Sequence, residues 1–189
     1  KSLSPSSGIN HLMTILMGGA CDIDNIQGLK LVELDLGAMK DTFKGPRFGM
    51  KGIRKMLDVW DRPLLCGIVK PKIGLNAKEY ATVVKEMVEA GCDVIKEDEI
   101  LQDQGICRFK ERLEEVSEII GKETIYLPSI TADGTKVLEN ATLAYSLGFK
   151  AVHVNIWASL GTFVELRDWS RMALFFQKSG DKVWTTGKF

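Results

Sequence analysis

Two stretches of the sequence, GIVKPKIGL at residues 67–75 and GCDVIKEDE at residues 91–99, decide the predicted fold. Each contains a short apolar run that ends in charged side chains, as expected of a buried strand that emerges at the edge of a sheet. Gly91 is suited to end the helix that we predict between them. The strands of this unit are predicted at residues 64–70 and 93–96. The helix is indicated by apolar residues at the spacing of one helical face, namely Tyr80, Val83, Val84, Met87 and Val88.

The same alternation continues along the chain, with units of roughly 30 residues, the size of a strand–helix repeat. Alternating strands and helices are typical of a parallel sheet, because each helix returns the chain to the start of the next strand. A doubly wound sheet and a barrel both fit such units, and both place their sites at the carboxyl ends of the strands. The further predicted strands cover residues 125–130, 151–157 and 172–177, and the further predicted helices cover residues 109–120, 135–147 and 163–169.

The composition excludes several classes of partner. The 189 residues are 45% hydrophobic and 26% charged, and 25 basic residues balance 25 acidic ones. This balance argues against nucleic acid as a partner. The chain has neither an apolar run of about 18 residues, which could cross a membrane, nor the apolar core of a signal peptide. We therefore expect a protein that binds no membrane. The four cysteines have no metal-like spacing and fit buried thiols in a reducing compartment, so we expect the protein to be cytoplasmic.

The first sixty residues follow another pattern. Residues 9–19 read INHLMTILMGG, which we interpret as a strand that runs into a glycine turn. Residues 29–37 alternate apolar and polar side chains, as a half-exposed strand does. We interpret the segment as the edge of a preceding domain followed by a linker. Since the chain lacks an initiating methionine and has no polar tail, we expect a fragment of a longer protein.

Charged side chains gather at the ends of the first two predicted strands. Alternate residues of a strand share a face, and adjacent strands lie about 4.8 Å apart, so these side chains should converge. A lysine that lies beside other cations or is partly shielded from water releases its proton more readily, and can act as a general base. Paired carboxylates supply the oxygen ligands that Mg²⁺ prefers. The residues are Lys70 and Lys72 after the first strand, and Lys96, Asp98 and Glu99 after the second.

Spacing alone leaves two interpretations of this cluster open. A salt-bridged strand end without catalysis is as good an interpretation as a metal site, because charged strand ends are common in such proteins. An ammonium group cannot bind a metal ion. Lys96 would therefore either pair with the carboxylates or be carbamylated by CO₂, which converts it into an oxygen ligand.

The two opening stretches closely resemble the active-site segments of RuBisCO large chains and RuBisCO-like proteins. Residues 43–57, FKGPRFGMKGIRKML, and residues 61–65, DRPLL, resemble the segment before the first barrel strand of that family. The resemblance extends over essentially the whole chain, which would be under half of a typical family member. It implies a partial (β/α)8 TIM barrel of about five βα units at residues 46–189. Residues 1–45 would then be the tail of an α+β N-terminal domain.

The resemblance also implies roles for the cluster. Lys70 matches the lysine that abstracts a proton during enolisation of a phosphorylated ketose, and Lys72 matches its neighbour, which helps to orient the substrate. Lys96 matches the lysine that is carbamylated by CO₂, while Asp98 and Glu99 match the two carboxylate ligands of Mg²⁺. The family assembles as homodimers or higher oligomers, so we expect the same here.

Several substrate contacts of a carboxylating enzyme are replaced in this chain. The loss of these contacts beside an intact metal set favours a RuBisCO-like enzyme with enolase or isomerase chemistry on another phosphorylated substrate. A genuine carboxylase with an unusual fifth strand, and an inactive fragment or assembly partner, remain as alternatives. The replacements are Gln177 and Lys178 for a His-Arg pair, Asp181 for a later His, Val154 and Asn155 for His-Asp, Pro128 or Ser129 for an Asn, and Gly19 for an Asn of the preceding domain.

The remaining candidates are weaker. Asn155, Lys178, Ser179 and Gly180 could contact substrate, with Lys178 acting on a phosphate as a point charge. Ser179, Gly180 and residues 185–187 could also form plain turns. His153, alone on a predicted strand, is best interpreted as a core histidine with satisfied hydrogen bonds. Since five units do not close an eight-stranded barrel, one edge of the sheet should be open.

Overall fold

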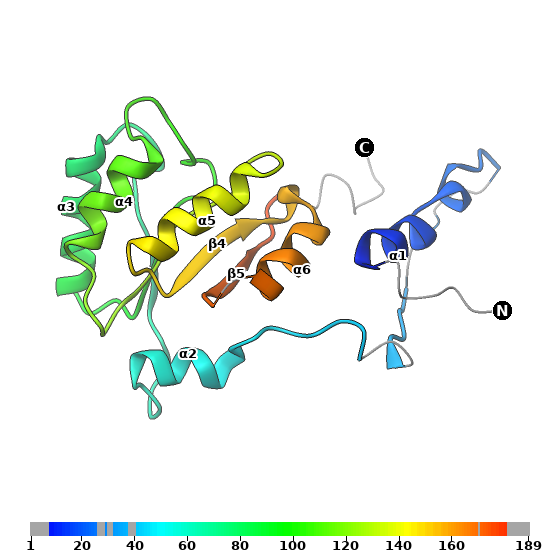
Figure 1. Cartoon of the computed structure of the whole chain (residues 1–189), viewed down its shortest axis with the longest axis horizontal. Helices are drawn as coiled ribbons and strands as arrows, with labels where there is room; N and C mark the ends of the chain where they lie inside the picture. The colour runs from blue at the N-terminus through cyan, green and yellow to red at the C-terminus, as the bar shows by residue number, and fades with distance from the viewer. Residues whose placement is uncertain (1–7, 26–28, 30–31, 38–40, 170, 181–189) are drawn as a thin grey trace.

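The computed structural model of the chain describes residues 8–25, 29, 32–37, 41–169 and 171–180. Asp181, which stands where the resemblance implies a later His, and residues 185–187, for which a plain turn was one interpretation, lie outside these ranges. The chain has an α/β fold in which helices alternate with parallel strands from α2 to β5 (Figure 1). The predicted fold class is therefore confirmed at this level.

The five predicted strands and the helices between them are present, with somewhat different bounds. The strands are β1 (Cys66–Ile68), β2 (Val94–Lys96), β3 (Ile125–Leu127), β4 (Ala151–Asn155) and β5 (Ala173–Gln177). The helices are α1 (Gly8–Leu16), α2 (Gly49–Leu57), α3 (Ala77–Glu89), α4 (Phe109–Ser117), α5 (Lys136–Ser146) and α6 (Leu160–Trp169), with short 3-10 turns η2 (Gly19–Asp22) and η4 (Ile156–Ala158).

All strand pairs are parallel. β1 pairs with β2 and β2 with β3, so that Ile68, Lys96 and Leu127 lie side by side. β4 pairs with β5, and an isolated parallel bridge between Ser129 and His153 joins the two sheets. The strands therefore follow one another in space in the order of the sequence. They lack the reversal of strand order that defines a doubly wound sheet.

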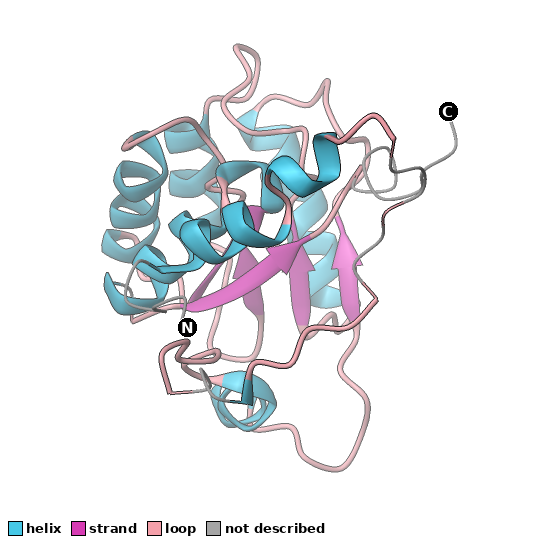
Figure 2. Cartoon of the chain, turned by 90° about the vertical axis from the view of Figure 1, so that its right-hand side faces the viewer, coloured by secondary structure: helices cyan, strands magenta, loops and turns pink. Residues whose placement is uncertain are grey.

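The two faces of the strand layer carry different apolar cores. On one face, α3, α4, α5 and α6 flank the strands (Figure 2), and Ile95 and Val152 are buried in the cluster that these helices share with the strands. On the other face, Leu127 and Ala151 form a smaller cluster with Leu57 of α2. Because side chains alternate along a strand, each of these strands contributes to both sides.

Local chemistry explains the boundaries of α3. The Asn76 side chain accepts hydrogen bonds from the backbone N–H groups of Lys78 and Glu79, and the Glu79 carboxylate accepts one from the backbone of Asn76. This capping box satisfies backbone donors that the start of a helix leaves free. Gly91, with φ of +83°, adopts the left-handed conformation after the helix and turns the chain into β2. The predicted helix end is confirmed.

Pro128 accounts for the short third strand. Proline has no backbone N–H and cannot continue a hydrogen-bonded ladder inside a sheet. β3 accordingly ends at Leu127, one residue before the proline. The carbonyl oxygen of Pro128 still accepts a hydrogen bond from the backbone N–H of His153 at 2.9 Å, so β4 remains attached beyond the end of the strand.

The predictions for the first sixty residues are wrong in their secondary structure. Residues 9–19 do not form a strand, because α1 spans Gly8–Leu16 and contacts α6. Ile9, Leu12, Met13 and Leu16 recur at helical spacing, a signal that the high apolar content concealed. Residues 29 and 32–37, the described part of the second predicted strand, contain no strand.

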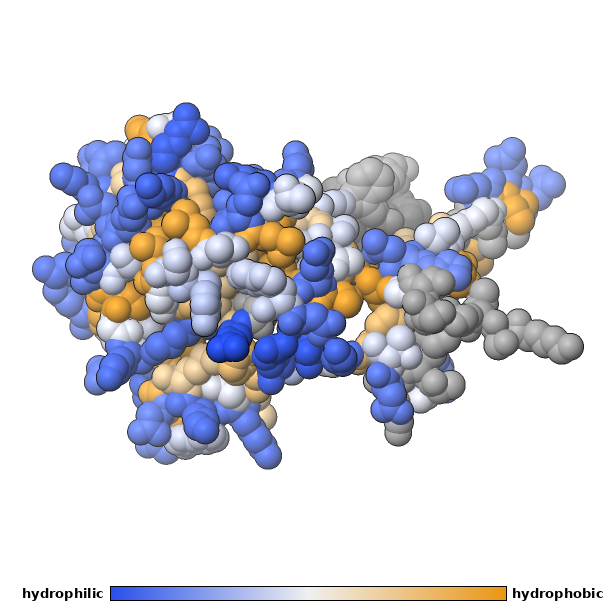
Figure 3. All heavy atoms as spheres, viewed as in Figure 1, coloured by the Kyte–Doolittle hydropathy of each residue, from blue (hydrophilic) through white to orange (hydrophobic). Residues whose placement is uncertain are grey.

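The outer strands and the surface agree with an open sheet edge. Among the described strands, β1 and β5 each have one neighbour, as predicted. The exterior is polar with scattered apolar side chains (Figure 3), and Phe175 and Phe176 of β5 are exposed. Cys66 is exposed as well, so the expectation of a buried thiol is wrong there, since its side chain lies on the face away from α3 and α4. Within the described ranges, no helix has the length and apolar composition that a membrane crossing requires.

Candidate functional site

The ends of β1 and β2 bring the predicted lysines and carboxylates together. The parallel register sets Lys70 beside Asp98, and Lys70 Nζ donates a hydrogen bond to Asp98 Oδ2 at 2.5 Å. Lys96 Nζ donates to the carbonyl oxygen of Glu97 at 2.8 Å and lies 3.4 Å from Glu99 Oε2. The convergence expected from the spacing is therefore present in the structure.

The members of this cluster differ in their access to solvent. The side chains of Lys96 and Asp98 are 3% and 4% exposed, whereas that of Lys70 is 53% exposed. Burial alone would raise the pKa of Asp98, but the hydrogen bond from Lys70, a backbone N–H and the charge of the exposed Lys72 together hold it below its usual range. Asp98 is therefore a carboxylate at neutral pH, with one cation from β1 beside it.

The side chain of Glu97 points to the opposite side of the strand and is fully buried. Its Oε1 accepts hydrogen bonds from Arg112 Nε at 2.6 Å and from the Tyr126 hydroxyl at 2.6 Å. Its Oε2 accepts from Arg112 Nη2 at 3.1 Å and from the backbone N–H of Ser129 at 2.7 Å. One carboxylate thus joins the end of β2 to α4 and to the segment after β3.

Arg112 extends this network into the segment that follows the carboxylates. Its Nη1 donates to the carbonyl oxygen of Cys107 at 2.8 Å, and its Nη2 donates to that of Gln102 at 2.8 Å. Burial by itself would lower the pKa of Arg112, but the charge and hydrogen bonds of Glu97 raise it above its usual value. Burial and the charge of Glu97 likewise raise the pKa of Tyr126. The pair is therefore charged, and every oxygen of the carboxylate is hydrogen-bonded.

Sequence reasoning missed this network. Arg112 is completely buried although it lies within the acid-rich stretch of residues 111–118. A usable signal was present, because Glu97 alternates with Lys96 and Asp98 and so has to face the helices. A buried carboxylate needs a cation, and Arg112 lies next to the apolar stripe of α4.

His153 lies in the same row of side chains as the candidate site. Extending the observed register sets Asp98 beside Ser129, and Ser129 and His153 are bridge partners. His153 is fully buried, yet neither ring nitrogen has a hydrogen-bond partner among the described residues, nor does the Ser129 hydroxyl. Burial, then the charge of Lys96, lower the pKa of His153 to about 3, so the ring is neutral. The prediction of a histidine with satisfied hydrogen bonds is wrong.

The weaker candidates meet at the ends of β4 and β5. Asn155 Nδ2 donates to Ser179 Oγ at 2.7 Å, and Trp157 Nε1 donates to the carbonyl oxygen of Ser179 at 3.0 Å. Gly180 has a φ of +73° and packs near the Trp157 ring, while Lys178 is exposed. Asn155 and Ser179 are thus held in one hydrogen-bonded group at the same edge of the strand layer as the lysines and carboxylates.

The residues available for a metal ion are Asp98 and Glu99. Within the described ranges, no group of three or more His, Cys, Asp or Glu side chains is arranged to hold a metal ion. Two carboxylates beside a buried lysine form a smaller set of donors, to which a carbamate on Lys96 would add a third oxygen ligand. Hard oxygen donors of this kind suit Mg²⁺.

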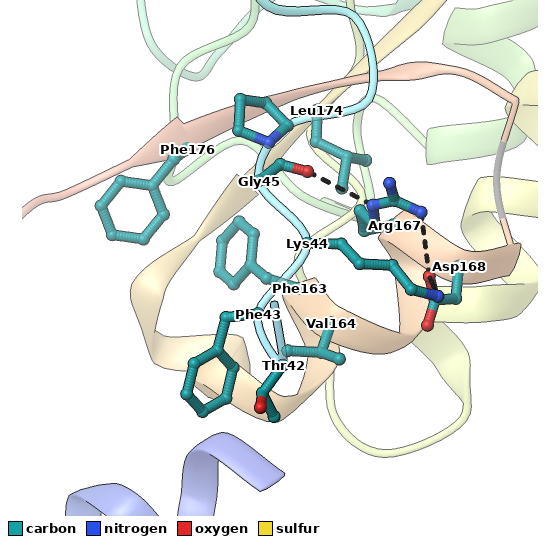
Figure 4. A pocket seen from close by; sticks show the side chains of 11 residues that line it. Thr42, Phe43, Lys44, Gly45, Phe163, Val164, Arg167, Asp168, Leu174 and Phe176 are labelled. Carbon is teal, nitrogen blue, oxygen red and sulfur yellow. Dashed lines mark hydrogen bonds and ion pairs between the residues drawn. The ribbon is translucent and has the colours of Figure 1, made fainter. Parts of the chain in front are cut away.

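A separate cavity of about 290 Å³ lies between the segment before α2 and the outer side of β5 (Figure 4). Its apolar wall includes Phe163 and Phe176, whose rings meet edge to face with centroids 5.0 Å apart. At its polar end, Lys44 Nζ lies 3.3 Å from Asp168 Oδ1. Phe176 alternates with Phe175, which contacts His153, so the cavity lies on the other side of β5 from the candidate site.

The Glu97–Arg112 pair should dominate local stability. We expect Arg112→Met to lower the free energy of unfolding by about 3–5 kcal/mol, because it leaves a buried carboxylate without its cation. Lys110→Met on the same helix removes an exposed ion pair with Glu114 and should change it by less than about 1 kcal/mol. Urea denaturation of both variants measures the difference. Equal stabilities of the two variants would contradict the assigned role.

The sequence matches one family of known proteins. Residues 49–187 match the model of the ribulose bisphosphate carboxylase large chain, catalytic domain. A ribulose bisphosphate carboxylase of Methanocaldococcus jannaschii is 33% identical over 159 residues, which are 78% of this chain and 37% of that protein. A 3-oxo-isoapionate-4-phosphate decarboxylase of Rhizobium etli is 32% identical over 187 residues, which are 94% of this chain and 45% of that protein.

Solved structures agree with these relatives. A rubisco-like protein from Burkholderia fungorum superposes with a TM-score of 0.89 at 28% identity, covering 94% of this chain and 46% of that one. A dimeric archaeal Rubisco from Hyperthermus butylicus superposes with a TM-score of 0.87 at 28% identity, covering 93% and 44%. The chain thus spans less than half the length of the proteins that it resembles.

Proposed function

Because this chain belongs to the superfamily of ribulose bisphosphate carboxylase (RuBisCO) large chains, we propose that its parent protein enolises or isomerises a phosphorylated ketose with the help of Mg²⁺. The observation that carries the proposal is the contact between Lys70 and Asp98, beside a buried Lys96 and Glu99. One strand edge therefore carries a lysine proposed as the general base, two carboxylates proposed as metal ligands, and a second lysine that is shielded from solvent. Each has a role in proton abstraction next to a carbonyl group.

The proposed architecture is the first part of a (β/α)8 barrel. The sequential order of five parallel strands, with helices on one face, supports a barrel segment at residues 46–189. Residues 1–45 would be the tail of an α+β N-terminal domain. The remaining strands of the barrel would pair with the outer strands β1 and β5. Homodimers or larger homo-oligomers are expected, since one of the similar solved structures is described as dimeric.

In the proposed metal site, Lys96 is carbamylated. The Nζ lone pair of the free amine forms a bond to the carbon of CO₂, one C–O π pair moves onto oxygen, and the protons released from nitrogen pass to solvent. The product is an anion with two oxygens. It would hold Mg²⁺ together with Asp98 and Glu99, whose hard oxygen donors fit that ion. Bound Mg²⁺ would polarise the substrate carbonyl and stabilise the enediolate charge.

Lys70 is the proposed base. Its half-exposed side chain can reach a substrate, whereas the buried Lys96 cannot. If Asp98 served as a metal ligand, it would no longer hold Lys70 in this ion pair. The amine would take the proton from the carbon next to the carbonyl group. Lys72 would help to orient the substrate.

Residues at the ends of β4 and β5 would contact the substrate and so help to determine which substrate binds. Asn155 and Ser179 offer neutral hydrogen-bonding groups, Gly180 offers a backbone N–H, and the exposed Lys178 offers a point charge for a phosphate. Gln177, Lys178 and Asn155 stand where the resemblance implies His, Arg and Asp contacts of a carboxylating enzyme, which favours a RuBisCO-like reaction. The carboxylase from Methanocaldococcus jannaschii, at 33% identity, supports carbon fixation as the second candidate.

Proton exchange tests the proposed reaction. The parent protein with Mg²⁺ and CO₂ should exchange the hydrogen next to the carbonyl group of a ketose phosphate with deuterated water, without fixing CO₂. Lys70→Met should slow this exchange by at least about a hundredfold, because it removes the base. Lys78→Met on α3 serves as the matched control and should retain the wild-type rate. Measurable carboxylation of ribulose bisphosphate would favour the second candidate instead.

Metal binding tests the assigned ligands separately. We expect Lys96→Ala to abolish Mg²⁺ binding measured by titration calorimetry in the presence of CO₂, because the carbamate can no longer form. Thermal unfolding of the variant shows whether it remains folded. If a folded Lys96→Ala protein binds Mg²⁺ as tightly as the wild type does, Lys96 is not part of the metal site.

A further inference from the structure

Two buried polar side chains, Ser129 and His153, lie next to one another between β3 and β4. The backbone of His153 is fully engaged, since its N–H donates to the carbonyl oxygen of Pro128 at 2.9 Å and its carbonyl oxygen accepts from the N–H of Ile130 at 3.0 Å, and the N–H of Ser129 donates to Glu97 Oε2 at 2.7 Å. Their side chains are 1% and 0% exposed. The Ser129 hydroxyl and both ring nitrogens of His153 nevertheless have no hydrogen-bond partner among the described residues.

Such unsatisfied groups are unfavourable and call for a partner. A buried polar atom without a hydrogen bond destabilises a fold, and most buried polar atoms in proteins are paired. The neighbouring carboxylate of Glu97 illustrates the usual state, with four hydrogen bonds to its two oxygens. Three unpaired atoms on two adjacent residues therefore indicate that a group outside the described residues binds there.

The position of the pair points to Lys96 as the site of that group. Ser129 continues the row of Asp98, and the charges of Lys96 and Asp98 both act on the His153 ring. On the other side of the ring, Phe175 presents an apolar edge at a centroid distance of 6.0 Å and offers no hydrogen bond. The unpaired groups thus lie on the face of the strands that carries Lys96 and Asp98, opposite the face that packs against α3, α4, α5 and α6.

The chemistry of the two groups matches an anion. A neutral imidazole has one N–H donor and one acceptor nitrogen, and a serine hydroxyl can donate one hydrogen bond. Carbamylation changes Lys96 from a cation into an anion with two oxygens in a site that is 3% exposed. A buried anion needs hydrogen-bond donors. Because a metal ion would occupy only some of the lone pairs on the carbamate oxygens, the remaining lone pairs would still need donors.

We propose that His153 and Ser129 are positioning residues that donate hydrogen bonds to the carbamate on Lys96 and so raise the affinity of that lysine for CO₂. The inference rests on the proposed function, since it requires the carbamate to form. It extends that function by assigning a role to two residues outside the set of metal ligands.

The test measures the carbamate directly in the parent protein. ¹³C NMR with ¹³C-labelled CO₂ and Mg²⁺ gives the occupancy of Lys96 as a function of CO₂ concentration. His153→Phe keeps an aromatic ring and removes both nitrogens, and Ser129→Ala removes the hydroxyl. We expect each variant to need about tenfold more CO₂ for half occupancy, the effect of losing one hydrogen bond to a charged acceptor. Tyr80→Phe, which removes a buried hydroxyl on the helix side, should leave the occupancy unchanged.

Stability without CO₂ provides the second readout. Replacing an unsatisfied buried polar group by an apolar one is neutral or stabilising, so both variants should unfold at or above the wild-type temperature when CO₂ is removed. Wild-type CO₂ affinity in both variants would overturn this inference and leave the proposed function intact. That result is also expected if an ordered water satisfies the pair. Absence of a carbamate in the wild-type protein would overturn both proposals.

Discussion

The buried ion pair between Glu97 and Arg112 is the interaction on which the arrangement of the site depends. It links β2, α4, the residues after β3 and the segment that follows the carboxylates, with all four hydrogen bonds of Glu97 inside the protein. Because neighbours in a strand face opposite ways, anchoring Glu97 among the helices turns Lys96 and Asp98 to the other side. The network therefore fixes the direction of the reactive side chains without contributing to the chemistry.

Much of this arrangement could be predicted from the sequence, for identifiable reasons. Apolar runs ending in charge located the strands, and the spacing of Lys70 and Asp98 was sufficient to expect their contact, since parallel register follows from the alternation of strands and helices. The Glu97–Arg112 pair was missed because its two residues are 15 positions apart, and the alternation that turns Glu97 toward the helices does not by itself identify Arg112 as its partner. The helix α1 was mistaken for a strand although Asn10, His11 and Thr14 separate its apolar residues at helical spacing.

The site consists of two parts with different relations to the family. The ends of β1 and β2 retain lysines and carboxylates that fit the metal chemistry implied by the resemblance. The ends of β4 and β5 instead carry a neutral group in which Asn155 and Ser179 are hydrogen-bonded to one another. Between the two parts lies the unsatisfied pair of Ser129 and His153. Under the proposed function, the lysines and carboxylates carry the reaction, and Asn155 and Ser179 contribute to the choice of substrate.

The central claim is that Lys96 becomes an oxygen ligand when CO₂ binds, and one measurement addresses it most directly. Titration calorimetry of the unaltered parent protein with Mg²⁺, performed with and without CO₂, measures the coupling between the two. If a carbamate completes the ligand set of Asp98 and Glu99, Mg²⁺ will bind more tightly when CO₂ is present, and CO₂ will bind more tightly when Mg²⁺ is present. An affinity for Mg²⁺ that does not depend on CO₂ would contradict the claim.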